Sequence, residues 1–194
     1  DEVFKQYGIH ISNEQYATTT GMRVKEFVIW WFTHFKVPLT NAAQAEKDIC
    51  NLVVQKVHTK GKPMPGIPHI INFFLERNFK LGLASSSGMD LIDVVVDKLG
   101  LRQYLQAICS AAHLPQGKPH PQVYLDCAAA LNSHPLECLC FEDSFNGLIA
   151  AKAARMKCVV VPALHDSNKP KFQAADLKLS SLQNFNELLL QTLH

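Results

Sequence analysis

From residue 67 onward the sequence alternates between helical segments and short, unbroken apolar runs. A short apolar run without polar alternation is typical of a strand that is covered on both faces. Strands that alternate with helices in this way predict a parallel sheet in an α/β domain. The predicted strands cover residues 79–84, 107–110, 137–141 and 158–161, with a weaker one at 177–179. The predicted helices cover residues 67–77, 89–99, 119–131, 145–155 and 184–193.

The N-terminal part of the sequence has a different pattern, which is helical throughout. Residues 24–35 form a strongly apolar helical stretch, and residues 42–58 carry apolar side chains at helical spacing. Between the two patterns, residues 60–66 concentrate two glycines and two prolines, which break regular structure. We therefore predict a helical cap domain over residues 1–62 and an α/β core over residues 63–194.

Charge and composition exclude several classes of function. The net charge is only +2 and no basic run occurs, so nucleic acid is not an expected partner. The apolar stretches are strand-sized, and no membrane span is therefore expected. The six cysteines form neither a Cys-x-x-Cys pair nor a zinc-type spacing with histidine. They are predicted to be buried, reduced thiols, which is typical of a cytoplasmic protein.

Three consecutive serines, Ser85, Ser86 and Ser87, follow the first predicted strand of the core. In open parallel sheets, ligands bind beyond the carboxyl ends of the strands. A hydroxyl group and neighbouring backbone N–H groups at such a junction can hold phosphate oxygens. As an alternative, Ser86 or Ser87 is simply the N-cap of the helix that begins at Met89. The residues alone leave both interpretations open.

A lysine stands at the start of a later predicted helix. Lys118 lies between Gly117 and Pro119, and Pro119 suits the first position of a helix. A lysine that points from there toward the edge of the sheet can neutralise a phosphate and an attacking carboxylate together. The alternative is an ordinary, solvated lysine in a loop.

A pair of carboxylates, Glu142 and Asp143, directly follows the predicted strand 137–141. Mg²⁺ is bound by one or two carboxylates together with phosphate oxygens and water. The alternative is that Asp143 or Ser144 caps the next helix, while Glu142 interacts with the dipole of that helix. A hydroxyl, a lysine and an acid pair after successive strands of one sheet together favour a Mg²⁺-assisted phosphoryl-transfer site.

In this order and spacing, the segments resemble the motifs of the haloacid dehalogenase superfamily. Residues 82–85 are similar to its second motif, 117–124 to its third and 141–147 to its fourth. The chain most resembles the β-phosphoglucomutase-like subgroup, and within it the bacterial 2-deoxyglucose-6-phosphate and hexitol phosphatases. The resemblance covers nearly the whole chain. It implies a doubly wound parallel sheet with a small helical cap.

The resemblance also implies roles for the core residues that match the motifs. Ser85 would bind the transferring phosphoryl group, with Ser86 as a further substrate-binding residue. Lys118 would bridge the phosphate and the nucleophile, so that Ser85 and Lys118 are the catalytic residues. The family's reaction passes through a phosphoaspartate, which water then hydrolyses.

The metal and the cap side of the site follow from the same resemblance. Asp143 would ligate Mg²⁺, with Glu142 beside it in the shell of the metal. Gly21 and Arg23 fall where the cap helps to hold the substrate. An arginine at the start of a helix can reach an anionic ligand, although a solvated arginine is the alternative.

The sequence departs from the family at its first motif, an Asp-x-Asp pair that ends the central strand. No Asp-x-Asp occurs in the 194 residues. We therefore expect that a segment upstream of Asp1 is missing from the sequence as given. We also expect that its sheet lacks the first, central strand, which would leave two half-sheets with unpaired edges. Without the nucleophile, the chain is not expected to hydrolyse phosphate esters.

The sequence favours a Mg²⁺-dependent phosphatase that acts on a small phosphorylated sugar, such as a hexose or 2-deoxyhexose 6-phosphate. We expect the protein to be a monomer. The first alternative is a phosphosugar mutase of the β-phosphoglucomutase type, which shares the same motifs. A second alternative, from another class, is a non-catalytic phosphate-binding module, and the absent Asp-x-Asp pair favours it.

Overall fold

The computed structural model describes residues 2–193, and its five strands among these residues form two separate parallel sheets. One sheet consists of β1 (Gly82–Ser85) and β2 (Ala107–Ser110), which pair in register from Gly82 with Ala107. The other has the order β3-β4-β5, formed by β3 (Leu139–Glu142), β4 (Lys157–Val160) and β5 (Leu177–Lys178). The predicted parallel α/β pattern is confirmed, and the described strands form two half-sheets, as expected.

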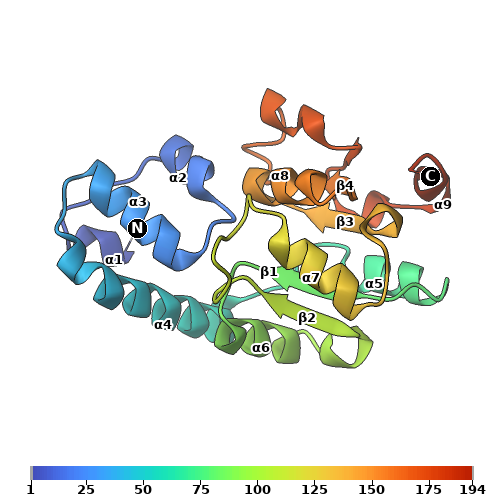
Figure 1. Ribbon diagram of the computed structural model, residues 1–194, viewed down its shortest axis with the longest axis horizontal. Coiled ribbons are helices and arrows are strands. Elements are labelled where there is room, and N and C mark those ends of the chain that lie inside the picture. The colour runs from blue at the N-terminus through green and yellow to red at the C-terminus, as the bar shows by residue number, and fades with distance from the viewer. Residues whose placement is uncertain (1, 194) are drawn as a thin grey trace.

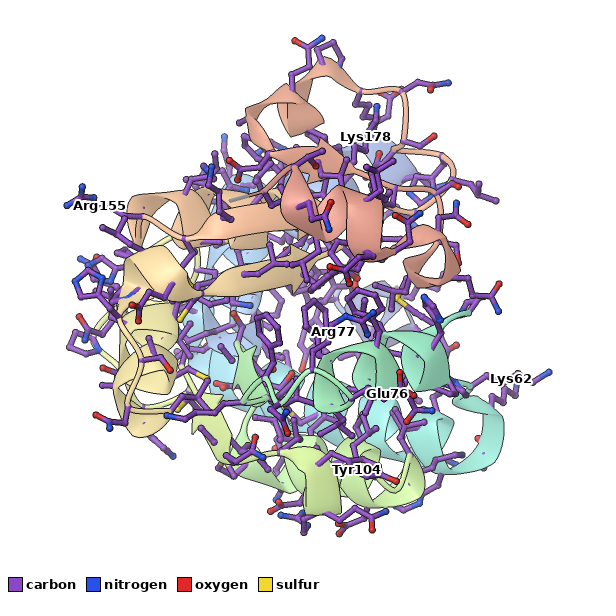
Figure 2. All side chains as sticks on the ribbon, turned by 90° about the vertical axis from the view of Figure 1, so that its right-hand side faces the viewer. Lys62, Glu76, Arg77, Tyr104, Arg155 and Lys178 are labelled. Carbon is purple, nitrogen blue, oxygen red and sulfur yellow. The ribbon has the colours of Figure 1, made fainter. Side chains whose placement is uncertain are left out.

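The two sheets face each other through the edges of β1 and β3, which have no strand between them in the described residues. Figure 2 shows β1 and β2 (green) below β3 and β4 (orange), with side chains filling the space between the two pairs. The two halves are joined by a cluster of aromatic rings. Phe141 of β3 lies 5.7 Å from Phe74 and 5.1 Å from Phe185, ring centre to ring centre. Leu81, which precedes β1, packs against the same cluster.

The strands alternate with helices, as predicted. These helices are α5 (Ile67–Leu75), α6 (Met89–Lys98), α7 (Gln122–Ala130), α8 (Phe145–Ala153) and α9 (Glu187–Gln191). Short 3-10 turns occur at Leu39–Asn41, Arg102–Tyr104, Pro135–Glu137, Pro170–Ala174 and Leu182–Asn184. The second main core cluster packs α7 and α8 against β3 and β4, with Val123, Leu148 and Cys158 almost fully buried.

The sequence placed several element ends incorrectly. The helix expected from residue 119 begins at Gln122, with Pro121 as its N-cap. Pro119 and Pro121 have no N–H, and the N–H of His120 bonds to the Gly117 carbonyl in a turn, so the helix starts only after them. The strand expected at 79–84 spans Gly82–Ser85, because only those residues pair with β2.

The N-terminal residues form a separate group of helices: α1 (Glu2–Lys5), α2 (Asn13–Thr19), α3 (Val24–His34) and α4 (Ala42–Lys60). They enclose a hydrophobic cluster of their own, which includes Phe4, Val28 and Phe32. Figure 1 shows this helical group beside the sheets, on the side toward which the arrowheads of β1 and β3 point. The carboxyl ends of the strands therefore face the helical group. No helix within residues 2–193 is long and apolar enough to cross a membrane.

Candidate active site

Lys118 connects the two sheets at the carboxyl ends of their facing strands. Its Nζ donates a hydrogen bond to the Ala84 carbonyl of β1 at 3.0 Å and another to Glu142 Oε1 of β3 at 2.7 Å. The lysine is only 6% exposed, and its Nζ lies 4.6 Å from the centre of the Tyr124 ring. Lys118 is therefore not the solvated loop lysine that the sequence left open as an alternative.

Protein donors occupy both oxygens of the Glu142 carboxylate. Oε1 accepts from Lys118 and from the Tyr124 hydroxyl, and Oε2 accepts from the Ser144 hydroxyl at 3.0 Å. The backbone N–H groups of Asp143 and Ser144 also donate to Oε2. Burial opposes ionisation of Glu142, but the Lys118 charge and these hydrogen bonds outweigh it and lower the pKa of the carboxyl. Burial and the negative neighbour raise the pKa of the Tyr124 hydroxyl, which stays a donor.

Asp143 is the carboxylate that remains available to a ligand. It is exposed, and its carboxylate makes no side-chain hydrogen bond or ion pair among the described residues, since only its backbone N–H contacts Glu142. The surrounding protein and the Glu142 charge raise the pKa of Asp143, although water around an exposed carboxyl screens this effect. Within residues 2–193, no group of three or more His, Cys, Asp or Glu side chains could hold a metal ion. One free carboxylate fits Mg²⁺ only when a substrate phosphate supplies further oxygens.

The start of α8 is built around the Glu142 carboxylate. Ser144 is the N-cap of α8, and its hydroxyl accepts from the N–H of Gly147 at 3.0 Å while it donates to Glu142. The sequence had allowed either Asp143 or Ser144 in the capping role, and the structure assigns it to Ser144. A Cβ at Gly147 would overlap the Glu142 carboxylate, so only glycine fits this close approach.

The serine segment after β1 does not cap the next helix. The N-cap of α6 is Gly88, and no side chain caps it, so the capping alternative for Ser86 or Ser87 is wrong. Instead, the Ser85 hydroxyl accepts from the N–H of Ser87 at 3.1 Å, and the Ser86 hydroxyl donates to the Gly21 carbonyl at 2.7 Å. Ser85 thus keeps its hydroxyl hydrogen for another acceptor.

The turn that contains Gly21 contacts both halves of the core. Ser86 binds it from the β1 side, and Asn146 Nδ2 of α8 donates to the Thr20 carbonyl at 2.8 Å from the β3 side. Gly21 has a φ of 89°, and a Cβ there would overlap the Ser144 side chain. Glycine is required at this point by conformation and by space together.

Arg23 is held by the loop that leads to Lys118. Its Nη1 donates to the carbonyls of Ala111 at 3.2 Å and Leu114 at 2.5 Å. Its Nη2 donates to Glu26 at 2.5 Å and to the Pro115 carbonyl at 3.4 Å. Glu26 in turn accepts from the N–H of Gly117 at 3.3 Å, which ties the start of α3 to the residue next to Lys118.

A cavity of about 460 Å³ opens between α3 and this loop. This volume lies within the range of roughly 300–1,000 Å³ that is usual for small-molecule sites. Lys118 and Glu26 both contribute to its wall. The lining residues are Met22, Glu26, Gln116, Gly117, Lys118, Pro119, His120, Pro121 and Ile149.

The structure brings together Lys118, Glu142 and Asp143. It also brings Lys118 to the end of β1, because Lys118 binds the carbonyl of Ala84, the residue before Ser85. Sequence reasoning missed Tyr124 as a partner of Glu142, because a tyrosine in an apolar helix has no signal of its own. It also missed Glu26. The spacing of Glu26 three residues after Arg23, at the start of a helix, is a local signal that could have indicated the ion pair.

Comparisons with known proteins give matches over most of the chain. The family model of haloacid dehalogenase-like hydrolases matches residues 1–161. Hexitol phosphatase B of Escherichia coli (strain K12) is 37% identical over 182 residues, which cover 93% of this chain and 82% of that protein. A fructose-1-phosphate phosphatase of Escherichia coli (strain K12) is 33% identical over 103 residues, which cover 53% of this chain and 54% of that protein.

Solved structures show the same fold. A β-phosphoglucomutase from Clostridium difficile superimposes with a TM-score of 0.85 at 22% identity, covering 99% of this chain and 86% of that one. CbbY from Rhodobacter sphaeroides, in complex with phosphate, gives a TM-score of 0.76 at 24% identity, covering 94% and 85%. The predicted haloacid dehalogenase-like α/β fold is confirmed by these matches.

Proposed function

The chain belongs to the haloacid dehalogenase-like hydrolases, and from this premise we propose that it forms the phosphate-binding site of a phosphatase that acts on small sugar phosphates. The observation that carries the proposal is the buried Lys118, which joins the ends of β1 and β3 and is held there by Glu142. A buried cation at the carboxyl edge of a parallel sheet is suited to a phosphate dianion. The relatives named as hexitol and fructose-1-phosphate phosphatases support a sugar phosphate as the ligand.

In this proposal, Ser85 and Lys118 contact the phosphoryl group directly. The Ser85 hydroxyl accepts from the Ser87 N–H and is free to donate its hydrogen to a phosphate oxygen. The Ser86 hydroxyl already donates to Gly21, so Ser86 contributes to substrate binding through its backbone N–H. The Lys118 ammonium has a third N–H beyond its two protein acceptors, and in this proposal that N–H donates to the phosphate.

Mg²⁺ is part of the same proposal, with Asp143 as its protein ligand and Glu142 in its surroundings. The ion would stabilise negative charge on the transferring phosphoryl group. The Glu142 carboxylate keeps Lys118 and the Ser144 cap in place rather than offering a free oxygen. Asp143, being exposed, is accessible to an ion that arrives together with the substrate.

We further propose that residues 1–62 act as a cap over the core formed by residues 63–194. The helical group has its own apolar cluster, and it reaches the core through Gly21 and Arg23. Gly21 and Arg23 then serve the substrate by positioning the cap against the Lys118 loop. We also propose that the protein is cytoplasmic, which the six free thiols support, and that it acts as a monomer.

The phosphoaspartate step needs an aspartate beside Lys118 as the nucleophile. In this proposal Asp143 is the ligand of Mg²⁺, so it does not serve as that nucleophile. We therefore propose that residues 1–194 bind sugar phosphates without hydrolysing them. A mutase of the same fold is the second candidate, favoured by the likeness to the β-phosphoglucomutase fold. A non-catalytic phosphate-binding module is the third, favoured by the absence of Asp-x-Asp in the sequence.

The test is calorimetric titration of residues 1–194 with glucose 6-phosphate in the presence of Mg²⁺, followed by ³¹P NMR of the mixture. Binding that is lost in Lys118→Ala supports the proposed site, and Lys98→Ala serves as the control because Lys98 binds carbonyls of α4 away from it. Release of inorganic phosphate would show that the chain is active as it stands. Conversion to glucose 1-phosphate without phosphate release would identify the mutase, and no binding would refute the site.

A further inference from the structure

We propose that Tyr124 is a positioning residue that keeps Lys118 available to a phosphate group, and that it acts through Glu142. The inference rests on the proposed function, because it takes Lys118 as the residue that binds phosphate. It adds a residue whose ring contacts Lys118 and whose hydroxyl contacts Glu142.

Tyr124 binds both members of the buried ion pair. Its hydroxyl donates to Glu142 Oε1, the same oxygen that accepts from Lys118 Nζ at 2.7 Å. The centre of its ring lies 4.6 Å from Lys118 Nζ, which is within the distance of a cation–π contact. One side chain therefore holds the carboxylate with its polar end and the ammonium with its ring.

The core fixes Tyr124 in this position. It is the third residue of α7, and only 6% of it is exposed. It belongs to the core cluster that also contains Val123 and Ala128 of the same helix and Cys140 of β3. Side chains in a close-packed core keep their rotamers, so packing holds the Tyr124 hydroxyl against Glu142.

The two oxygens of Glu142 have different donors. Oε2 accepts from the Ser144 hydroxyl and from the N–H groups of Asp143 and Ser144, whereas Oε1 accepts from Lys118 and Tyr124. Without the Tyr124 hydroxyl, Lys118 would be the one donor to Oε1 among the described residues. A buried, charged oxygen that loses a donor interacts more strongly with the donor that remains, so Glu142 would draw Lys118 more strongly.

This effect reaches a phosphate because the phosphate and Glu142 share the charge of Lys118. Two of the three N–H groups of Lys118 are directed to the Ala84 carbonyl and to Glu142, and the Tyr124 ring covers one side of the ammonium. The Tyr124 hydroxyl takes part of the negative charge on Oε1 and so weakens the competition between Glu142 and a phosphate. Tyr124 thus strengthens phosphate binding without contacting the phosphate.

The experiment compares the affinity of residues 1–194 for glucose 6-phosphate with that of Tyr124→Phe, by calorimetry with Mg²⁺ present. The substitution keeps the ring beside Lys118 and removes only the hydroxyl. Because a hydrogen bond to a charged group is lost, we expect binding to weaken about three- to tenfold. Tyr104→Phe is the matched control. It removes the same hydroxyl from the turn Arg102–Tyr104, before the amino end of β2, and should change the affinity by less than about twofold.

A second pair of variants tests whether Tyr124 acts through Glu142. Glu142→Gln keeps an oxygen for Lys118 and Tyr124 but removes the charge. In that background, Tyr124→Phe should change the affinity by less than about twofold, because no carboxylate charge remains to draw Lys118 away. General damage to the core would weaken binding in both backgrounds, so the comparison separates a positioning role from a merely structural one.

The possible failures are distinguishable. If the wild-type chain does not bind the ester, the proposed function fails, and the role of Tyr124 fails with it. If the wild type binds, Lys118→Ala does not, and Tyr124→Phe stays within about twofold of the wild type, the site stands but the role of Tyr124 is refuted. Equal losses in the two backgrounds also refute it. Near-ultraviolet circular dichroism shows whether each variant is folded. If Tyr124→Phe alone is unfolded, Glu142→Gln is compared with the double variant, and a change above about threefold there refutes the proposal.

Discussion

The contact between Gly147 and Glu142 gives the sharpest test of the site's construction. Gly147 lies in the first turn of α8, and its backbone is helical, so alanine is conformationally acceptable there. Alanine would even favour the helix by about 1 kcal/mol. A Cβ at this position, however, would overlap the Glu142 carboxylate, which is held from its other sides by Lys118, Tyr124 and Ser144.

The expected cost of Gly147→Ala follows from these opposing effects. Overpacking of a tight site costs about 1–3 kcal/mol, and breaking a buried ion pair costs about 3–5 kcal/mol. The Lys118–Glu142 pair is buried, with side chains that are 7% and 8% exposed. After subtracting the helix term of about 1 kcal/mol, we expect a net loss of roughly 2–4 kcal/mol in the free energy of unfolding.

Urea denaturation at neutral pH measures this loss, provided the slope of the transition is unchanged. Gly88→Ala is the matched control. A Cβ at Gly88 meets only the flexible end of Asp90 at 3.0 Å, so its cost should stay below about 1 kcal/mol. A double-mutant cycle with Glu142→Ala identifies the cause, because removing the carboxylate should relieve most of the cost of Gly147→Ala. Equal costs of Gly147→Ala in both backgrounds, or a cost within 0.5 kcal/mol of zero, would refute the reasoning.

Four further predictions concern the charges around Lys118. Lys118→Ala leaves the Glu142 carboxylate buried and unpaired, and we expect it to lower the free energy of unfolding by about 3–5 kcal/mol in urea titrations. A loss below about 1 kcal/mol would show that water or another cation replaces Lys118. Mg²⁺ alone should bind weakly, because Asp143 is the one free carboxylate at the site; calorimetry that gives micromolar affinity without phosphate would contradict this. In the presence of glucose 6-phosphate, Asp143→Asn should abolish any gain in affinity that Mg²⁺ produces. Because folding lowers the pKa of Glu142, its contribution to stability is present above its ordinary value of 4.5 and is lost as the pH falls through the lowered value. The urea midpoint of the wild type should therefore fall more steeply below about pH 4.5 than that of Glu142→Gln, and parallel curves would contradict the prediction.

Much of the architecture was predictable from local sequence because each signal involves neighbouring residues. The breaker cluster at 60–66, the apolar runs and the helical periodicity predicted the order of helices and strands correctly. The helix ends were less predictable. The start of α7 at Gln122 rather than at residue 119 depended on how two prolines and the His120 turn share their hydrogen bonds.

The sequence by itself determined which polar groups follow the strands, since strand ends and the residues after them are set by local pattern. Only the tertiary structure decided what those groups do. It directed Lys118 to both Ala84 and Glu142, used up the oxygens of Glu142, and left Asp143 exposed. It also locked Arg23 against backbone carbonyls some ninety residues away, which no local pattern encodes. The physical reason is that side-chain partners across a sheet edge or between two layers depend on the packing of distant segments, whereas secondary structure depends mainly on near neighbours.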